Sequence, residues 1–449
     1  MNIIIITVLL ILTMFLVLYT KNIITVFLIL VILNLYFPPY ISIGGLQIST
    51  TFNFLSLLAI CYFLTKKIAR PNLKELYLAL SYLGLLVFWS IINGTFLSST
   101  QIFGFKRTLG IFSVASFCFF ALKDQKQITK LHSCLIFFLY ILTTYGIFCY
   151  LTQSNIILTA INLIFNPTDN ILESFSNEVR GGLEGRIQGF CTHPLAYGGI
   201  LIVSFFYILY FMNLKKNKYI SIGLLILIFI NIFLCGSRSA LIALGAGIFI
   251  YFFILGKFKI KQKIYIIAAI VTIYFILFIS SGFLTQYQEY INSIIFFWEN
   301  NNEVKGSNFD MRLNQLDASF SIISTDPITF LFGKGDKWCL NYSMTHGGLH
   351  PQLLGFESIL FIGLIEYGVI GFVIITCGLY FKLLFFNKKY GNSPIIQCFI
   401  ITFFIFQFFT GDYAWLPFLC IVMLMIKAEI IYHKQLISNE NNIHHCTYI

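Results

Sequence analysis

The sequence predicts an all-α polytopic membrane protein, a transmembrane helical bundle of about 12–13 spans with two large extracytoplasmic loops. Apolar residues make up 58% of the 449 residues, whereas charged residues make up only 10%. Soluble domains of ordinary composition carry charge on about 25% of their residues. The apolar residues also form long runs, and roughly 20 such residues suffice to cross ~30 Å of hydrocarbon as a helix.

The apolar runs are continuous, as at 222–230 and 241–255, rather than alternating with polar residues. A transmembrane β-barrel requires that alternation, so the runs indicate helices, which satisfy their backbone groups internally. Residues 3–19 resemble a signal peptide, but they lack a basic start and a small-residue cleavage site, and a second apolar run follows at once. We therefore expect them to form a span.

The whole chain, 1–449, is predicted to be a single transmembrane domain. The predicted spans are 3–20, 22–38, 51–65, 76–97, 103–122, 131–152, 194–213, 219–235, 238–255, 263–283, 357–381, 394–410 and 413–432. The two longest polar stretches, 153–193 and 284–356, are predicted to be the large loops. Within the second loop, Leu313, Leu316, Phe320 and Ile323 recur at helical spacing and predict an amphipathic helix that ends at 326–327.

Lysine-rich links fix the predicted orientation, because cytoplasmic links retain Lys and Arg. These links lie near residues 21, 66–74, 123–130, 215–218, 257–263, 382–389 and 427–434, and each follows an odd-numbered span. The chain is therefore expected in the cell inner membrane, with the C-terminus cytoplasmic and both large loops periplasmic. The net charge of +11 follows from this topology and requires no nucleic acid partner.

Five of the six arginines are predicted to lie on the side opposite these links. They are Arg107, Arg180, Arg186, Arg238 and Arg312. Arginine binds phosphate or carboxylate through two parallel hydrogen bonds and keeps its charge when partly desolvated. The cluster indicates an anionic headgroup such as a pyrophosphate, and the alternative is pairing with the acidic residues of the same side.

Arg238 stands in a Cys235-Gly-Ser-Arg-Ser239 turn between two strongly apolar runs. An ionisable group flanked so closely by hydrocarbon is costly and indicates function. The alternative is that Arg238 extends to lipid phosphates as an anchor. Arg107, near the outer end of its span, allows the same two interpretations.

Four patches between residues 180 and 371 resemble the bacterial O-antigen polymerase and O-antigen ligase family. The patches are Arg186-Ile-Gln-Gly-Phe190 followed by His193-Pro194, Gly236-Ser-Arg-Ser239, Arg312 through Pro327 to Gly333-Lys-Gly335, and Glu357-Ser358 followed by 365–371. Phe190 follows Gly189 directly, whereas the family pattern has one residue between them. In the ligases a histidine usually stands eleven residues before the glycine matching Gly368, and here that position holds Glu357. The resemblance therefore favours polymerase over ligase.

The resemblance implies transfer of a growing glycan from undecaprenyl diphosphate to the next lipid-linked repeat unit. It assigns Arg186, Arg238 and Arg312 to the diphosphate and Glu357 to the catalytic base. Glu357 as a carboxylate stabilising a helix N-terminus is the alternative. Residues expected to bind substrate are Arg107, Arg180, His193, His346 and His350. Membrane lipids and a chain-length regulator protein are the other expected partners, and no cofactor is expected.

His346 and His350 have the spacing of a zinc-binding helix, but two intervening glycines and Pro351 oppose a helix, so no metal is expected. Cys191 and Cys339 lie in the two outer loops, where a disulfide between them remains an option. A flippase for the same lipid-linked sugar is the competing non-enzyme interpretation. A transporter should show internal repeats and charges deep in the bundle, and apart from Glu366 the sequence shows neither.

Overall fold

The computed structural model describes most of the helical bundle. The described residues are 42–43, 46–47, 73–94, 99–165, 186–191, 193–214, 218–256, 259, 261, 309–346, 350–353, 358–411 and 414–446. Within these ranges the chain is helical apart from turns and one antiparallel pair of short strands, β1 (Ser42–Ile43) and β2 (Leu46–Gln47). The spans predicted at 3–20, 22–38, 51–65 and 263–283 lie outside the described residues.

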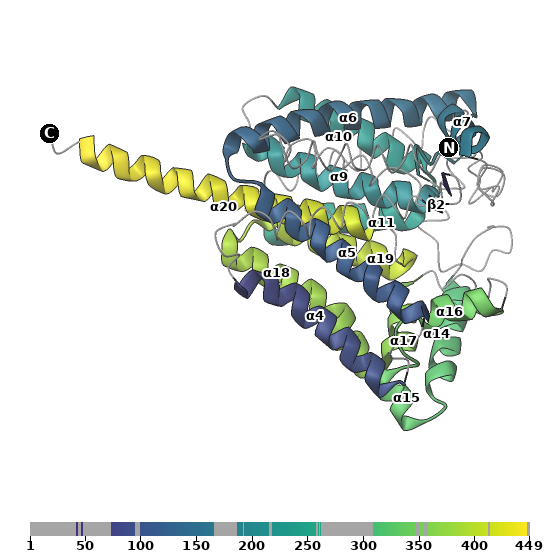
Figure 1. The fold of residues 1–449 in the computed structure, drawn as a ribbon. Coiled ribbons are helices and arrows are strands. Elements are labelled where there is room, and N and C mark those ends of the chain that lie inside the picture. The colour runs from purple at the N-terminus through teal and green to yellow at the C-terminus, as the bar shows by residue number, and fades with distance from the viewer. Residues whose placement is uncertain are drawn as a thin grey trace.

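Each span predicted within the described ranges is a helix (Figure 1). The helices are α4 (Leu73–Ile92), α5 (Ser99–Ala121), α6 (Gln125–Thr152), α9 (Pro194–Leu214), α10 (Tyr219–Leu234), α11 (Arg238–Phe249) with the π-helix η1 (Ile250–Leu255), α17 (Ile359–Gly371) with η2 (Phe372–Cys377) and α18 (Gly378–Tyr390), α19 (Pro394–Thr410) and α20 (Trp415–Cys446). Several predicted boundaries were wrong, by the largest margin at the C-terminal ends of two spans. The span predicted to end at 381 continues as a helix to Tyr390, and the last helix continues from 432 to Cys446.

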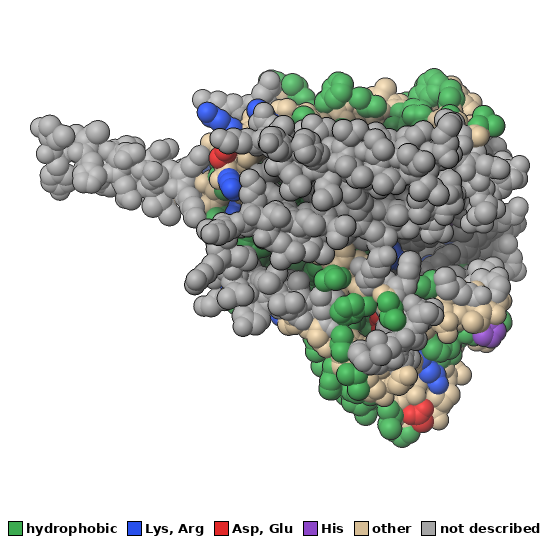
Figure 2. Space-filling model, viewed as in Figure 1, with side chains coloured by type: hydrophobic (Ala, Val, Ile, Leu, Met, Phe, Trp, Pro, Cys, Tyr) green, Lys and Arg blue, Asp and Glu red, His purple; other side chains and the backbone are tan. Residues whose placement is uncertain are grey.

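The outer faces of the bundle are apolar, as a lipid environment requires. Phe137 and Phe385 are each 69% exposed and Ile226 is 56% exposed, which would be an aggregation hazard in water. Figure 2 shows hydrophobic side chains along the edge that α6 and α10 form, and lysine or arginine side chains where α20 leaves the bundle. Five described helices are long and apolar enough to cross a membrane, and three shorter apolar helices accompany them. The chain is a multi-pass membrane protein.

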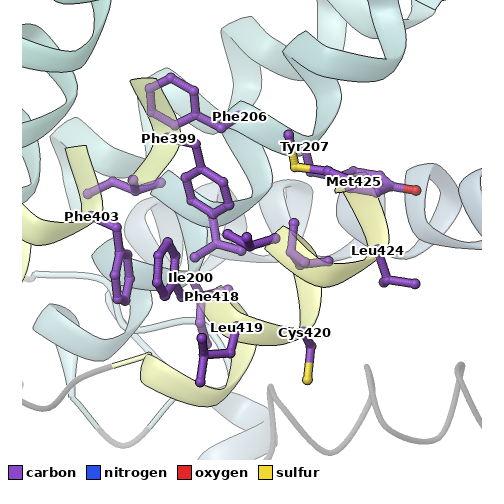
Figure 3. Close-up of a cluster of buried hydrophobic side chains, with 14 of the residues drawn as sticks. Ile200, Phe206, Tyr207, Phe399, Phe403, Phe418, Leu419, Cys420, Leu424 and Met425 are labelled. Atoms are coloured by element: carbon purple, nitrogen blue, oxygen red, sulfur yellow. The ribbon is translucent and has the colours of Figure 1, made fainter. Parts of the chain in front are cut away.

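The core lies where α9, α19 and α20 pack together (Figure 3). Phe403 and Phe418 stack with ring centroids 3.9 Å apart and planes 5° apart, and Phe206 stacks on Phe399 at 5.5 Å. All four side chains are fully buried. Because lipid tails are as apolar as these side chains, such packing rather than the hydrophobic effect holds the helices together.

A buried polar network ties α6, α9 and α10 together near the start of α9 and the end of α10. The Tyr197 hydroxyl donates to Asn231 Oδ1 at 2.8 Å, and Asn231 Nδ2 donates to the Thr143 carbonyl at 3.0 Å. Gly146 lets α6 and α10 approach closely, because a Cβ there would lie 2.0 Å from Asn231 Oδ1. The network fixes the relative position of three helices whose ends support the arginine turn described below.

The described helices alternate between two ends of the bundle (Figure 1). At one end, the turn at Gly391 lies against Glu429 of α20, and the Lys427 ammonium lies 4.9 Å from the Phe119 ring centroid of α5. At the other end, Asn155 Nδ2, just after α6, donates to the Gly189 carbonyl, just before α9, at 2.8 Å. The alternation predicted from the lysine links therefore holds along the described chain.

The two loops that the sequence predicts to be the outer loops contain helices of their own. They are α7 (Ile156–Phe165), α14 (Phe309–Ile323), α15 (Pro327–Phe332) and α16 (Trp338–Thr345). The helix predicted in the second loop is present as α14, and it ends before Asp326 and Pro327. Asp326 caps the next helix, α15, because its carboxylate accepts a hydrogen bond from Thr329 N at 2.8 Å.

The predicted apolar face of α14 is buried only in part. Ile323 is fully buried and Leu316 packs against the cluster around Ala318, whereas Leu313 and Phe320 are 44% and 37% exposed. Gln315, Ala318 and Ser319 are buried as well. Helix α14 packs against α17, and smaller side chains allow two helices to approach closely where bulky ones would hold them apart. Leu313 and Phe320 are left at the surface.

Candidate functional site

The first two sequence patches form a single structural unit. Arg186 is 5% exposed, and its Nε donates to the carbonyl of Cys235 at 3.1 Å. Its side chain lies across Gly236, where a Cβ would stand 2.9 Å from Arg186 Cγ and Nε. Gly236 has φ +62°, a conformation that favours glycine. The backbone of the next residue, Ile187, also donates to the Leu234 carbonyl at 3.3 Å.

Arg238 begins α11 immediately after this turn. Ser237 caps the helix, and its hydroxyl accepts from Ala240 N at 3.3 Å. Arg238 itself is half-buried. The positive end of the α11 dipole, the Arg186 side chain and the first residue of α11, Arg238, therefore lie at one turn, an arrangement that favours a bound anion.

The beginning of α9 joins this turn to α19. A Cβ at Gly198 would lie 3.4 Å from Ser237 Cβ, and one at Gly199 would lie 2.8 Å from the Phe406 ring. Two successive glycines therefore let α9 fit between the arginine turn and α19. His193 stands just before α9, and its Nδ1 accepts from Leu195 N at 2.9 Å, so it caps this helix. Its expected contact with substrate stays a prediction.

Arg312 reaches the C-terminal end of α19 from the outer loop. Its NH2 donates to the Phe409 carbonyl at 3.3 Å, and its NH1 donates to Gln315 Oε1 at 2.9 Å. A cation at this end of a helix is stabilised by the helix dipole. Ser358, the N-cap of α17, donates to the neighbouring Phe408 carbonyl at 2.5 Å. The third arginine and the start of α17 therefore meet at the same end of α19.

Two predicted site residues lie outside the described residues. They are Arg180 and Glu357. Arg107 is exposed on α5, three residues after Gly104. The side chain of Lys337 lies against Gly104, where a Cβ would be 2.5 Å from Lys337 Cγ. Arg107 is thus beside the outer-loop helix α16.

His346 and His350 lie at the exposed end of α16. The His346 ring stacks on Tyr342 with centroids 4.1 Å apart, and the Tyr342 and His350 centroids are 5.1 Å apart. Partial burial, together with the nearby His346, lowers the pKa of His350 and favours a neutral imidazole. Helix α16 ends at Thr345, so the two histidines do not share a helix, as the glycines predicted. The described residues contain no cluster of three or more potential metal ligands.

The optional disulfide between Cys191 and Cys339 is absent, since both cysteines are free and buried. They belong to different apolar clusters, Cys191 to the main core and Cys339 to a small cluster of α14, α16 and α17. Burial raises the pKa of the Cys191 thiol, which therefore stays protonated beside the arginine turn.

A group of charges that the predicted site omitted lies where the outer loop meets α17. Asp336 and Glu366 are 5% and 2% exposed, and the charge of Lys337 acts on the Glu366 carboxylate. The sequence did indicate Glu366, because a carboxylate inside an apolar run is costly and is a functional candidate by default. The sequence did not show that Asp336 and Lys337 would meet it.

In a comparison with protein families, residues 223–376 match the family described as O-antigen ligase. A search of curated proteins finds no match. The matched segment includes the Arg238 turn, Arg312 with the outer-loop helices, and the first half of the α17 span. The similarity to this family therefore covers the segment of the chain that holds Arg238 and Arg312.

Proposed function

We propose that this protein is an O-antigen polymerase. It transfers a growing glycan from undecaprenyl diphosphate to the next lipid-linked repeat unit on the periplasmic face of the inner membrane. The observation that carries the proposal is the packing of Arg186 against the Gly236-Ser237-Arg238 turn. An arginine packed on a turn that carries a second arginine at a helix N-terminus suits a diphosphate.

The proposed reaction is a displacement at the anomeric carbon of the donor glycan. A hydroxyl of the acceptor repeat forms a new bond to that carbon, the bond to the diphosphate oxygen breaks, and undecaprenyl diphosphate leaves. Glu357 takes the hydroxyl proton. Arg186, Arg238 and Arg312 stabilise the negative charge that develops on the diphosphate, so the residues themselves supply the electrostatic part of catalysis.

Ligation of the glycan to lipid A-core is the second candidate function, because the matched family is described as O-antigen ligase. In that reaction a neutral histidine could serve as the base, and the lowered pKa of His350 suits this role. Glu357, at the position that the ligase histidine usually occupies, favours the polymerase.

The surface glycan profile of a strain lacking the gene tests the proposal. Lipid A-core bearing a single repeat is expected, and wild-type protein should restore the ladder of longer chains. Glu357→Gln should fail to restore it, because an amide cannot take the proton, whereas the exposed Asp317→Asn in the same loop should succeed. Bare core, with polymerised glycan accumulating on undecaprenyl diphosphate, would instead establish the ligase and direct attention to His350.

The proposed orientation has its own test, with one cysteine at each end of α6. Lys126→Cys and Ser154→Cys each place a thiol at an exposed position, in a background where the exposed Cys134 is replaced by serine. An impermeant thiol reagent added to cells with a permeable outer membrane should label Ser154→Cys and spare Lys126→Cys. The reverse pattern would overturn the proposed orientation.

A further inference from the structure

Helix α17 is interrupted in the middle of its apolar span. Gly368 has φ +69° and ψ −174°, a conformation open only to glycine, so the hydrogen-bond ladder of the helix is broken there. Backbone carbonyls freed in this way need new donors, because lipid supplies none.

Donors from outside the helix satisfy three successive carbonyls at the break. Lys334 N donates to the Ile365 carbonyl at 2.7 Å and Gly335 N donates to the Glu366 carbonyl at 3.0 Å. Trp89 Nε1, from α4, donates to the Tyr367 carbonyl at 3.0 Å. The outer loop is thus fastened by its backbone to the interrupted span.

The Glu366 side chain adds a second attachment to the same loop. Its Oε1 accepts from the backbone N–H of Cys339, in the first turn of α16, at 3.2 Å. The charges of Lys337 and Asp336 both act on this carboxylate, and Asp336 in turn accepts from the Tyr367 hydroxyl at 2.6 Å. Burying a carboxylate costs several kcal/mol of desolvation free energy. Stabilisation of the fold is therefore a weak explanation for a buried glutamate at this position.

The attachment extends to the helix that carries Arg312. Cys339 packs with Ala318 of α14 and Ile365 of α17 in one buried cluster. Glu366 follows Ile365 directly, and Ala318 lies six residues after Arg312. The position of Arg312 over the end of α19 therefore depends on how α16 is seated against α17.

From this geometry we infer that Glu366 is a positioning residue for the transfer reaction. It seats α16 on the interrupted span and thereby sets the place of α14 and its Arg312. The effect on the reaction rests on the proposed function, in which Arg312 takes part. The seating of α16 by Glu366 rests only on the contacts described above. The carboxylate accepts from a backbone N–H in the first turn of α16, where the helix dipole stabilises negative charge, and the positive charge of Lys337 acts on it.

The test compares Glu366→Gln with Glu366→Asp and with the exposed Asp317→Asn of α14. Glutamine keeps an acceptor for Cys339 N but removes the charge, so the variant should still insert. Because small displacements of a catalytic group cost up to about 100-fold, its kcat should fall at least tenfold while the acceptor KM changes less than about twofold. Aspartate should restore most of the kcat, and Asp317→Asn should match the wild type.

Reaction of Cys339 with N-ethylmaleimide, followed by peptide mass spectrometry, supplies a readout independent of activity. Cys339 is 5% exposed and should become several-fold more reactive in Glu366→Gln, with the exposed Cys134 as an internal standard. Unchanged protection of Cys339, or faster labelling with unchanged kcat, would overturn the inference. Wild-type protein without polymerising activity would overturn the proposed function instead, and Cys339 labelling would then decide the seating role by itself.

Discussion

Replacing Arg238 by lysine is expected to reduce polymer formation at least about 100-fold while leaving membrane insertion intact. Lysine keeps the positive charge at the start of α11, but it cannot place two parallel donors on a diphosphate. The Ser237 cap and the Gly236 turn do not depend on the arginine side chain, so the helix should still begin at the same residue. The measurement is polymer length and yield from purified protein and lipid-linked repeat units.

Arg70→Lys makes the same chemical change in a lysine-rich link and should retain wild-type activity. If Arg238 only anchors the protein to lipid phosphates, lysine would replace it well. Full activity of Arg238→Lys would therefore exclude the diphosphate role and favour anchoring.

Replacing Gly368 by alanine is expected to lower the free energy of unfolding by about 3 kcal/mol or more. A Cβ at this position would lie 2.5 Å from the Leu331 carbonyl carbon and oxygen and from Phe332 N, which are backbone atoms that cannot rotate away. The positive φ adds strain of its own. The expected result is a large loss of monodisperse protein and a lower melting temperature in detergent.

Gly245→Ala in α11 is the matched control, since a Cβ there meets nothing within 4 Å. Alanine is the better helix former by up to about 1 kcal/mol, so this variant should be as stable as the wild type or slightly more so. Equal stability of Gly368→Ala and Gly245→Ala would show that the span is not fastened to the outer loop at Gly368.

The sequence predicted the spans well because a lipid bilayer imposes a simple rule on it. A helix in hydrocarbon satisfies its own backbone, so a long apolar run is sufficient for each span found among the described residues. Boundaries were less predictable where polar residues continue a helix beyond the apolar run. Lys388 and Lys389 lie in the last turn of α18, and the final helix continues to Cys446.

The candidate site was predictable in part. Arginine stood out chemically against links made almost entirely of lysine, and the sequence placed Arg186, Arg238 and Arg312 on one side of the membrane. That Arg186 would pack on the Arg238 turn was not predictable, because 49 residues separate Arg186 from Cys235, whose carbonyl it binds. The buried face of α14 was also unpredictable from hydrophobic spacing, since Gln315 and Ser319 face the partner helix.

By itself, the sequence determined the fold class, the alternation of the spans and the chemical character of the arginine side. Local rules govern these properties, namely the free energy of placing each side chain in lipid or in water. Only the tertiary structure decided which groups meet. The backbone approach of Gly333 to the interruption at Gly368, and the burial of Glu366 with Asp336 and Lys337, depend on contacts between distant segments. Such contacts arise from the shapes of whole packed helices, which no single stretch of sequence specifies.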